Sequence, residues 1–389
     1  MRKPIVIALA IFTSLLAGRV AVAAANRELE AKIQRVESGL LPETASGTKP
    51  ERMTLSARMG HYHVPAVSIA VVNGGRIEWA RGYGELQAGG GKKVDSDTLF
   101  QAASISKPVA AMTAMRLVEL GKLSLDEDVN IKLRSWKVPD NEFTKTQKVT
   151  LRRLLSHTAG VTVHGFRGYA ANEPVPALLQ VLDGVKPANS PPIRVDIVPG
   201  TEWRYSGGGY VIVQQLIEDV TGKPFAEVAN ELVIRPLGMT RSAYQQPLSD
   251  ALASNAAHAH DGDGRPIEGR WHTYPERTAA GLWTTPSDLA RVILAMQTPG
   301  KALQPKSADE MLNVVRDKYG LGFGVEATAG ARSFSHGGAN EGFRCMLFGY
   351  RDSGRGAVVM TNGDAGGALA AEVLRAISAE YGWPGYKTK

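Results

Sequence analysis

The chain of 389 residues has a single cysteine, Cys345, so it can form no internal disulfide bond. A chain of this length can bury enough apolar surface to be stable without one. Cys345 stands in the apolar run Cys345-Met346-Leu347-Phe348, which favours a buried packing role over a reactive thiol. With 21% charged and 43% hydrophobic residues, the composition is that of an ordinary globular protein.

The sequence also lacks a cluster of basic residues. Its formal charge is +7, but the Lys and Arg residues are scattered, which argues against nucleic-acid binding. A long apolar run occurs only near the start, so no other segment is expected to span a membrane. The Gly-x-Ser-x-Gly turn of α/β-hydrolases does not occur either.

The first residues have the composition of a secretion signal. Arg2 and Lys3 precede a short apolar run over 5–16, and small residues follow that offer cleavage sites. We predict a signal peptide over 1–25, an exported (periplasmic or secreted) protein, and no stable membrane insertion after signal removal. Removing the three basic residues of this segment would leave a formal charge of +4. The alternative is a membrane anchor, which the short run and Arg19 disfavour.

Apolar periodicity and turn residues predict the order of helices and strands. Helices are expected over 27–40, 104–120, 149–155, 211–221, 286–296 and 368–381. Strands are expected over 67–72, 76–82, 333–336, 344–350 and 357–361. The first two strands are joined by Asn73-Gly74-Gly75, a strong hairpin signal because Asn and Gly tolerate positive φ.

Strands near both ends with helices between them predict a mixed α/β (α+β) fold. We expect an antiparallel β-sheet flanked by helices, with an inserted all-helical subdomain. The sheet-containing domain would comprise 26–125 plus 275–389, and the helical subdomain with its loops would span 126–274. The helix over 104–120 is apolar on nearly all sides, which predicts that it runs through the middle of the fold.

The start of this apolar helix carries Ser104-Ile105-Ser106-Lys107. A serine hydroxyl needs an adjacent base before it can attack a carbonyl. The i, i+3 spacing brings the Lys107 amine beside Ser104, and burial would lower the pKa of that amine and make it available as a base. Taken alone the pattern is weak, because a helix N-cap followed by a solvated lysine produces it too.

Two glycine-flanked segments add candidate residues. Tyr205 precedes Gly207 and two further glycines at the start of a helix, and could pass a proton between nucleophile and leaving group. His336 precedes Gly337-Gly338-Ala339, where the N–H of Ala339 could join that of Ser104 as an oxyanion hole. The alternatives are a core tyrosine in the first segment and a glycine turn with a surface histidine in the second.

Ser104-x-x-Lys107, Tyr205-x-Gly207 and His336-x-Gly338 occur in this order along the chain. They are accompanied by Leu-Leu-Ser-His-Thr-Ala-Gly-Val over 154–161, Arg-Pro-Leu-Gly-Met over 235–239 and Leu-Trp-Thr-Thr-Pro-Ser-Asp-Leu over 282–289. The combination resembles the serine β-lactamase-like family of class C type, which includes penicillin-binding D,D-peptidases, D-amino-acid peptidases and esterase-B-like carboxylesterases. The resemblance covers nearly all the chain after the signal.

The resemblance implies a β-lactamase/transpeptidase-like fold with the site between sheet and helical subdomain. It implies Ser104 as the acylated nucleophile, Lys107 as its activating partner and Tyr205 as the general base that assists deacylation. Which of Lys107 and Tyr205 takes the first proton stays open, since their titrations are coupled. The implied substrate-binding positions are His336, Gly338, Ala339 and Gly207. No cofactor and no metal are implied, and the implied partners are small-molecule esters, amides, peptides or β-lactams.

Two departures from the family pattern bear on the substrate. Gly207 stands where Asn is usual, so an amide that could bind the acyl side chain is lost. His336 stands where many members have Lys, so a fixed positive charge for a β-lactam carboxylate is missing or pH-dependent. We therefore expect an esterase or peptidase with weak or absent β-lactam hydrolysis. The loops over 165–172 and 186–198 are expected to determine the substrate.

The same residues are also compatible with two other functions. A class C-type β-lactamase is the first alternative. A penicillin-binding sensor that acylates without turnover is the second, and Tyr205 argues against it because a trap needs no base. The histidine pairs His61/His63 and His258/His260 would be the start of a metal site, but further ligands are not evident. Ester versus amide, D versus L stereochemistry and the oligomeric state stay open.

Overall fold

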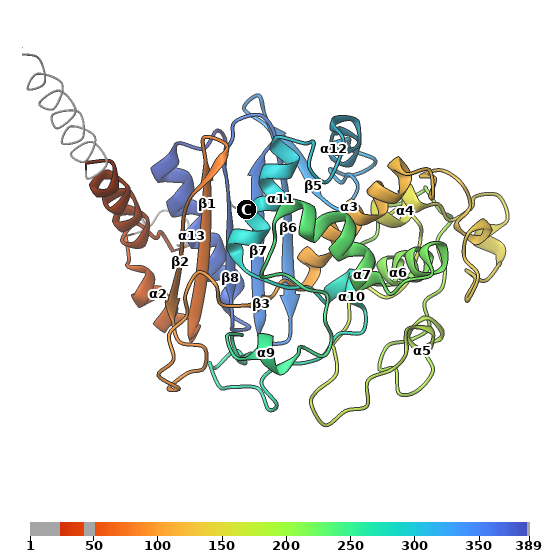
Figure 1. The fold of residues 1–389 in the computed structure, drawn as a ribbon, viewed down its shortest axis with the longest axis horizontal. Coiled ribbons are helices and arrows are strands. Elements are labelled where there is room, and N and C mark those ends of the chain that lie inside the picture. The colour runs from red at the N-terminus through yellow and green to blue at the C-terminus, as the bar shows by residue number, and fades with distance from the viewer. Residues whose placement is uncertain (1–23, 43–50, 387–389) are drawn as a thin grey trace, which may run out of the picture.

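A computed structural model of the chain describes residues 24–42 and 51–386 (Figure 1). The predicted signal segment, 1–25, lies almost wholly outside these residues, so the signal peptide stays a prediction. No helix in the described part is both long enough and apolar enough to cross a bilayer.

The centre of the molecule is an antiparallel sheet in the order β2-β1-β8-β7-β6-β5 (Figure 1). Its strands are β1 (Ala66–Asn73), β2 (Arg76–Gly84), β5 (Gly324–Thr328), β6 (Ala331–Asn340), β7 (Phe343–Tyr350) and β8 (Gly356–Thr361). A separate ribbon joins β3 (Phe100–Gln101) to β4 (Trp283–Thr284). Because β1 pairs with β8, strands from both ends of the chain complete one sheet, which confirms the predicted fold class.

Helices cover the sheet and fill the middle of the sequence. A helix over 24–37 comes first. The others are α2 (Leu55–His61), α3 (Ser106–Glu119), α4 (Leu151–Leu155), α5 (Leu178–Asp183), α6 (Gly207–Thr221), α7 (Phe225–Ala229), α8 (Arg235–Leu237), α9 (Asp250–Ala253), α10 (Arg277–Ala280), α11 (Pro286–Gln297), α12 (Pro305–Leu312) and α13 (Gly366–Tyr381). The predicted boundaries of the two domains stay a prediction.

Both faces of the sheet are buried at its centre, which explains why β1 and β8 are almost continuously apolar. In β1, Val67 and Ile69 face a core formed with α13 and the helix over 24–37. Ala70, on the other face of the same strand, belongs to a larger core that includes α11 and α3. This second core continues without interruption into the helical region, so sheet and helices share the interior in which the site is embedded.

The predicted hairpin between β1 and β2 is present, but its turn begins one residue later than the Asn-Gly pattern indicates. Asn73 is still in the strand and pairs with Arg76. Gly74 and Gly75 form the turn, with φ values of +58° and +72°. A two-residue turn of this kind needs positive φ at both positions, so the pair of glycines defines it rather than Asn-Gly.

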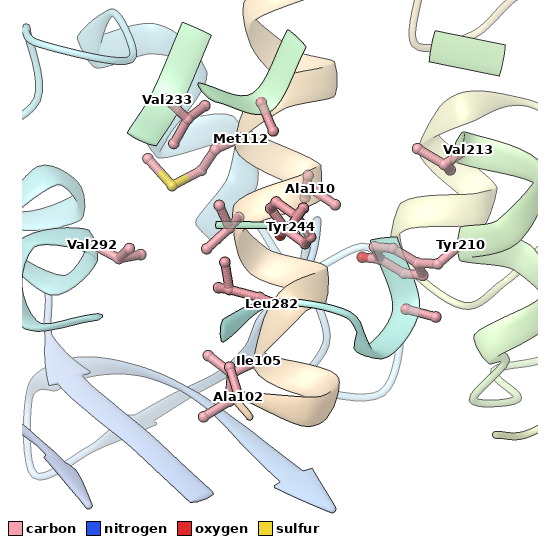
Figure 2. Packing of buried hydrophobic residues seen from close by; sticks show 14 of the residues in the cluster. Ala102, Ile105, Ala110, Met112, Tyr210, Val213, Val233, Tyr244, Leu282 and Val292 are labelled. Carbon is pink, nitrogen blue, oxygen red and sulfur yellow. The ribbon is translucent and has the colours of Figure 1, made fainter. Parts of the chain in front are cut away.

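The helix α3 runs through the main core, as its apolar composition predicts. Figure 2 shows Met112 and Ala110 of α3 among side chains that come from distant segments, including Tyr210 of α6 and Val292 of α11. The helix begins at Ser106 rather than at residue 104. Residues Ala103–Ile105 form a preceding 3-10 turn, which places Ser104 just outside the helix proper.

Two other elements differ from prediction for identifiable reasons. The edge strand β5 was not expected, and most of its residues are exposed, so it carries little apolar signal. The helix α6 begins at Gly207, four residues before the predicted start of 211. Its first turn is capped by Ser206, whose Oγ accepts a hydrogen bond from the N–H of Gly209 at 2.9 Å, and this cap compensates for the poor helix propensity of glycine.

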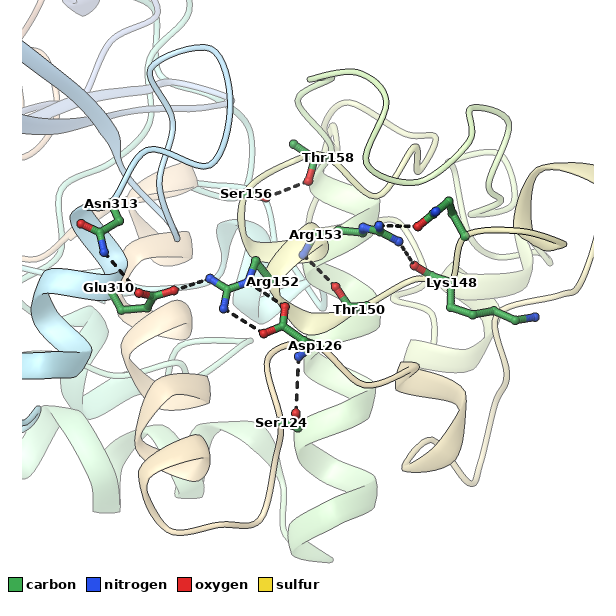
Figure 3. A network of polar contacts seen from close by, with 11 residues as sticks. Ser124, Asp126, Lys148, Thr150, Arg152, Arg153, Ser156, Thr158, Glu310 and Asn313 are labelled. Atoms are coloured by element: carbon green, nitrogen blue, oxygen red, sulfur yellow. Dashed lines mark hydrogen bonds and ion pairs between the residues drawn. The ribbon is translucent and has the colours of Figure 1, made fainter.

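Polar contacts join the helical region to α12 (Figure 3). The guanidinium of Arg152 in α4 makes a two-pronged ion pair with Asp126, with N–O distances of 2.7 and 2.9 Å, and a further pair with Glu310 in α12. The loop after α12 leads to Tyr319. Arg152 therefore links α4 to α12, the helix that precedes Tyr319 in the chain.

Candidate active site

Ser104 lies on a tight turn between the sheet and α3. The preceding residue, Ala103, has a φ of +49°, a conformation that costs free energy for any residue but glycine. The strand β6 passes against this turn so closely that a Cβ on Gly338 would lie 2.3 Å from the carbonyl oxygen of Ala102. Gly338 is thus needed for the close approach that brings β6 alongside Ser104.

Lys107 is buried beside Ser104. Its Nζ lies 3.0 Å from Oγ of Ser104 and donates a hydrogen bond of 2.8 Å to the carbonyl oxygen of Ala279 in α10. The side chain is only 2% exposed, and this burial lowers the pKa of the amine to about 7. A large share of the molecules therefore carries a neutral amine at neutral pH, as a base for Ser104 requires.

Tyr205 lies on the other side of the same pair. Its ring centroid is 5.0 Å from Nζ of Lys107. Burial raises the pKa of Tyr205 to about 12, and a side-chain hydrogen bond with Ser104 opposes that rise. Burial thus favours the neutral forms of both Lys107 and Tyr205, so the phenol enters the reaction as a protonated hydroxyl.

His157 packs against Tyr205, a contact that the sequence patterns did not predict. Its ring centroid is 4.2 Å from that of Tyr205, and its Nδ1 accepts a hydrogen bond of 3.1 Å from the N–H of Ser206. Burial holds the pKa of His157 well below its usual range, so the imidazole is uncharged. The only sequence signal was the segment over 154–161, which contributed to the family resemblance without a role for its histidine.

His336 on β6 faces the same group of side chains, with its ring centroid 6.2 Å from that of Tyr205. It is 7% exposed, so the alternative of a surface histidine is wrong. Its Nδ1 lies 2.6 Å from the carbonyl oxygen of Gly337, to which it donates a hydrogen bond. Burial, with the nearby Lys107 charge, lowers the pKa of His336 to about 3. The positive charge is therefore missing at neutral pH, rather than pH-dependent in that range.

The register of the β6–β7 hairpin determines the direction of the backbone N–H of Ala339. Asn340 and Phe343 pair across the two-residue turn that joins β6 to β7. Residues that flank such a turn exchange hydrogen bonds, and the alternation then directs the N–H of Ala339 away from β7. This is the orientation that an oxyanion hole shared with the N–H of Ser104 requires.

A cavity of about 860 Å³ opens above these groups. Ser104, Lys107, Tyr205, His336, Gly338 and Ala339 all line it. The remaining surface includes an aromatic wall, which we define as His164, Phe166, Trp203 and Tyr319. Of the two loops expected to determine the substrate, the one over 165–172 supplies Gly165 and Phe166, whereas the cavity lining includes no residue from 186–198.

Gly207 is the one predicted site residue that does not line the cavity. A Cβ added to it would lie 3.0 Å from the ring of Phe166 and 3.1 Å from the carbonyl oxygen of His164. Phe166 therefore lies between Gly207 and the cavity. No sequence pattern indicates this contact, because residues 166 and 207 are adjacent only in the folded chain.

Cys345 and His260, which the sequence analysis weighed as a reactive thiol and a metal ligand, are both buried and have contacts typical of structural residues. Cys345 is buried, and burial raises the pKa of its thiol to about 12, which fits the predicted packing role. Both ring nitrogens of His260 are engaged, Nδ1 with the carbonyl oxygen of Asn362 at 2.9 Å and Nε2 with the N–H of Ala88 at 3.1 Å. Across the described ranges, no three His, Cys, Asp or Glu residues are grouped so as to hold a metal ion.

The chain is similar in sequence to known proteins over most of its length. Residues 52–380 match the sequence model of the Beta-lactamase family. Penicillin-binding protein 4 of Amycolatopsis lactamdurans is 27% identical over 348 residues, which cover 82% of this chain and 86% of that protein. Esterase EstB of Burkholderia gladioli is 30% identical over 268 residues, which cover 65% of this chain and 64% of the esterase.

The fold has solved counterparts. The octameric penicillin-binding protein homologue from Pyrococcus abyssi superposes with a TM-score of 0.72, covering 84% of this chain and 76% of that one. The two sequences are 21% identical, so this likeness concerns the fold alone.

Proposed function

The chain belongs to the β-lactamase family of serine hydrolases, and from this premise we propose that it is an exported esterase or peptidase that forms an acyl-enzyme on Ser104. The observation that carries the proposal is the 3.0 Å separation between Oγ of Ser104 and the buried Nζ of Lys107. A buried amine with a lowered pKa at this distance is the arrangement that activates a serine hydroxyl.

In the acylation step, Oγ of Ser104 attacks the substrate carbonyl carbon while its proton passes to the neutral amine of Lys107. We assign this first transfer to Lys107 because Tyr205, with a pKa raised to about 12, is a phenol rather than a phenolate. The N–H groups of Ser104 and Ala339 stabilise the oxyanion. The leaving group departs with a proton that Tyr205 donates, and Tyr205 recovers it from the ammonium of Lys107.

Deacylation reverses these roles. A water molecule attacks the acyl carbon and gives its proton to Tyr205, which passes its own proton to the neutral amine of Lys107. The ester bond to Ser104 then breaks, Oγ regains a proton from Lys107, and the free acid leaves. The neutral imidazole of His157, at 4.2 Å between ring centroids, holds Tyr205 in position for both steps.

β-Lactam hydrolysis is proposed to be weak for two reasons. His336 is uncharged at neutral pH, so it offers no cation to the carboxylate of a penicillin or cephalosporin. Residue 207 has no side chain and lies behind Phe166, so it cannot bind the acylamino group of such a substrate. Export after removal of residues 1–25 is likewise a proposal, supported by Arg2, Lys3 and the apolar run that follows them. Fractionation of cells that express the full chain would test it.

The test of function compares substrates on one enzyme preparation. Initial rates would be measured for p-nitrophenyl esters, D-amino-acid amides, a chromogenic cephalosporin and benzylpenicillin, with Ser104→Ala as the control. We expect Ser104-dependent hydrolysis of esters or amides at a kcat/KM about 100-fold or more above that of the β-lactams. Rapid cephalosporin turnover would instead make the protein a class C-type β-lactamase, and a single acylation without turnover would make it a binding module.

A further inference from the structure

The contact between Phe166 and Gly207 has a consequence for substrate choice. The ring of Phe166 occupies the space into which any side chain at position 207 would project, with Cε2 3.0 Å from the place of a Cβ. Phe166 is half-buried and packs against the main core, and its ring also lines the cavity. The ring of Phe166, from the loop over 165–172, thus occupies the place that a side chain at position 207 of α6 would occupy.

The loop that carries Phe166 is anchored on both sides. Before it, the carbonyl oxygens of Val163 and His164 accept hydrogen bonds from the N–H groups of Gly208 and Gly207, at 3.0 and 2.9 Å. After it, the carbonyl oxygen of Arg167 accepts one from the hydroxyl of Tyr274 at 3.1 Å. The backbone on both sides of Phe166 is therefore held in place before a substrate arrives, so the contribution of Phe166 to binding is not offset by ordering the loop.

The same bonds occupy the N-terminus of α6. The N–H groups of Gly207 and Gly208 bond to the loop, and that of Gly209 bonds to Oγ of Ser206. A helix N-terminus is a natural site for an anion only when its first N–H groups are free. Here they are used, so this end of the cavity offers an aromatic ring and not an anion site.

Charge elsewhere on the cavity surface does not change this conclusion. Apart from Lys107 and the histidines, the basic residues that line the cavity are Lys318 and Arg344. Lys318 pairs with Glu326 at 3.2 Å, and Arg344 pairs with Asp364 at 2.8 Å. Away from Lys107, a carboxylate on the substrate would lose its hydration without gaining an unpaired cation, which disfavours its binding.

We propose, on the basis of the function proposed above, that Phe166 is the specificity-determining residue of the acyl subsite and selects uncharged substrates with an aromatic or bulky apolar acyl group. Position 207 is the one that the family resemblance associates with the acyl side chain. In this chain Phe166 covers position 207. Phe166 contacts the acyl group through its apolar ring, whereas the Asn side chain usual at position 207 would form a hydrogen bond with it.

The experiment compares p-nitrophenyl phenylacetate, butyrate, acetate and monosuccinate, which differ only in the acyl group. In the wild type, kcat/KM should be highest for phenylacetate and lowest for the charged succinate. In Phe166→Ala, the phenylacetate-to-acetate ratio should fall about 10-fold or more, because the lost contact is with the phenyl ring of the acyl group. Phe166→Leu, which keeps an apolar side chain, should lie between the two.

Phe143→Ala is the matched control, because Phe143 is also half-buried against the main core but does not line the cavity. Its substrate ratios should equal those of the wild type. A series of acetate esters with different alcohols should respond equally in all variants.

An unchanged phenylacetate-to-acetate ratio in folded Phe166→Ala and Phe166→Leu would overturn the inference alone. Succinate hydrolysis as fast as that of butyrate would overturn it too. If Ser104→Ala were as active as the wild type, the proposed function would fail and the inference with it, so the two failures are distinguishable.

Discussion

Ser104 and Lys107 lie three residues apart on one buried segment, whereas the aromatic wall of the same cavity comes from three loops far apart in the chain. The first region is local in sequence, and both of its side chains take part in the proposed proton transfers and bond making. The second region is assembled only by folding, and none of its four side chains is required by the proposed chemistry. This difference predicts that substitutions in the first region lower all rates alike, whereas substitutions in the wall change the ratio between substrates.

The largest effect is expected from Lys107→Ala. Removal of the base should lower kcat/KM about 10³- to 10⁴-fold for every ester, with the ratios between esters unchanged. Lys122→Ala, which changes an exposed lysine just beyond the end of α3, is the control and should leave rates within about twofold. A loss under tenfold for Lys107→Ala in steady-state assays would show that another group activates Ser104.

A smaller but still general effect is expected from Tyr205→Phe. Loss of the hydroxyl should lower kcat about 100-fold, because the proton of the leaving group and that of the attacking water lose their carrier. Deacylation is expected to become rate-limiting, so a burst of p-nitrophenol of one equivalent should precede the slow phase. A stopped-flow trace without a burst, at an unchanged kcat, would assign Tyr205 to packing.

The pH dependence should follow Lys107. The base is active when deprotonated, so kcat/KM should rise with pH, about tenfold from pH 5 to 6, and level off above its pKa of about 7. His336, with a pKa of about 3, is uncharged throughout this range and therefore does not change the pH dependence of kcat/KM. The rise in rate near pH 7 should persist in His336→Gln, and its loss in that variant would assign the titration to His336.

The smallest effect on activity is expected from Glu276→Gln, although its effect on stability is measurable. Glu276 is the N-cap residue of α10, the helix in which the carbonyl oxygen of Ala279 accepts a hydrogen bond from Lys107. Both of its carboxylate oxygens are buried without a partner in the described part of the chain. Burial raises the pKa of Glu276 to about 8 from 4.5. The folded state binds this proton more tightly, so the contribution is favourable at low pH and is lost as pH rises from about 4.5 to 8.

The free energy of unfolding of the wild type, relative to Glu276→Gln, should therefore fall by about 3 kcal/mol between pH 5 and pH 8. Urea unfolding at several pH values measures this difference. Substrate ratios should not change, because Glu276 does not line the cavity. A difference in stability that is constant with pH would mean that the carboxyl group does not titrate in this range.

The sequence was informative where structure is local. The spacing of Ser104 and Lys107, the apolar helix behind them and the glycine hairpin near residue 74 all depend on neighbours within a few positions. It was uninformative where distant segments meet. The exposed edge strand β5 has almost no apolar pattern, and the ring of Phe166 covers Gly207 across 41 positions of sequence. The uncharged state of His336 likewise depends on burial by other segments, which periodicity alone does not reveal.

The central claim is that Ser104 carries the acyl group and that a neutral Lys107 makes it reactive. The most direct test is the intact mass of the protein after rapid mixing with a slowly deacylating ester at several pH values, followed by peptide mapping. The account predicts one acyl group per chain, on the peptide that contains Ser104, forming faster as pH rises through about 7 and absent from Ser104→Ala. An acyl group on another residue, or equal labelling of Ser104→Ala, would contradict it.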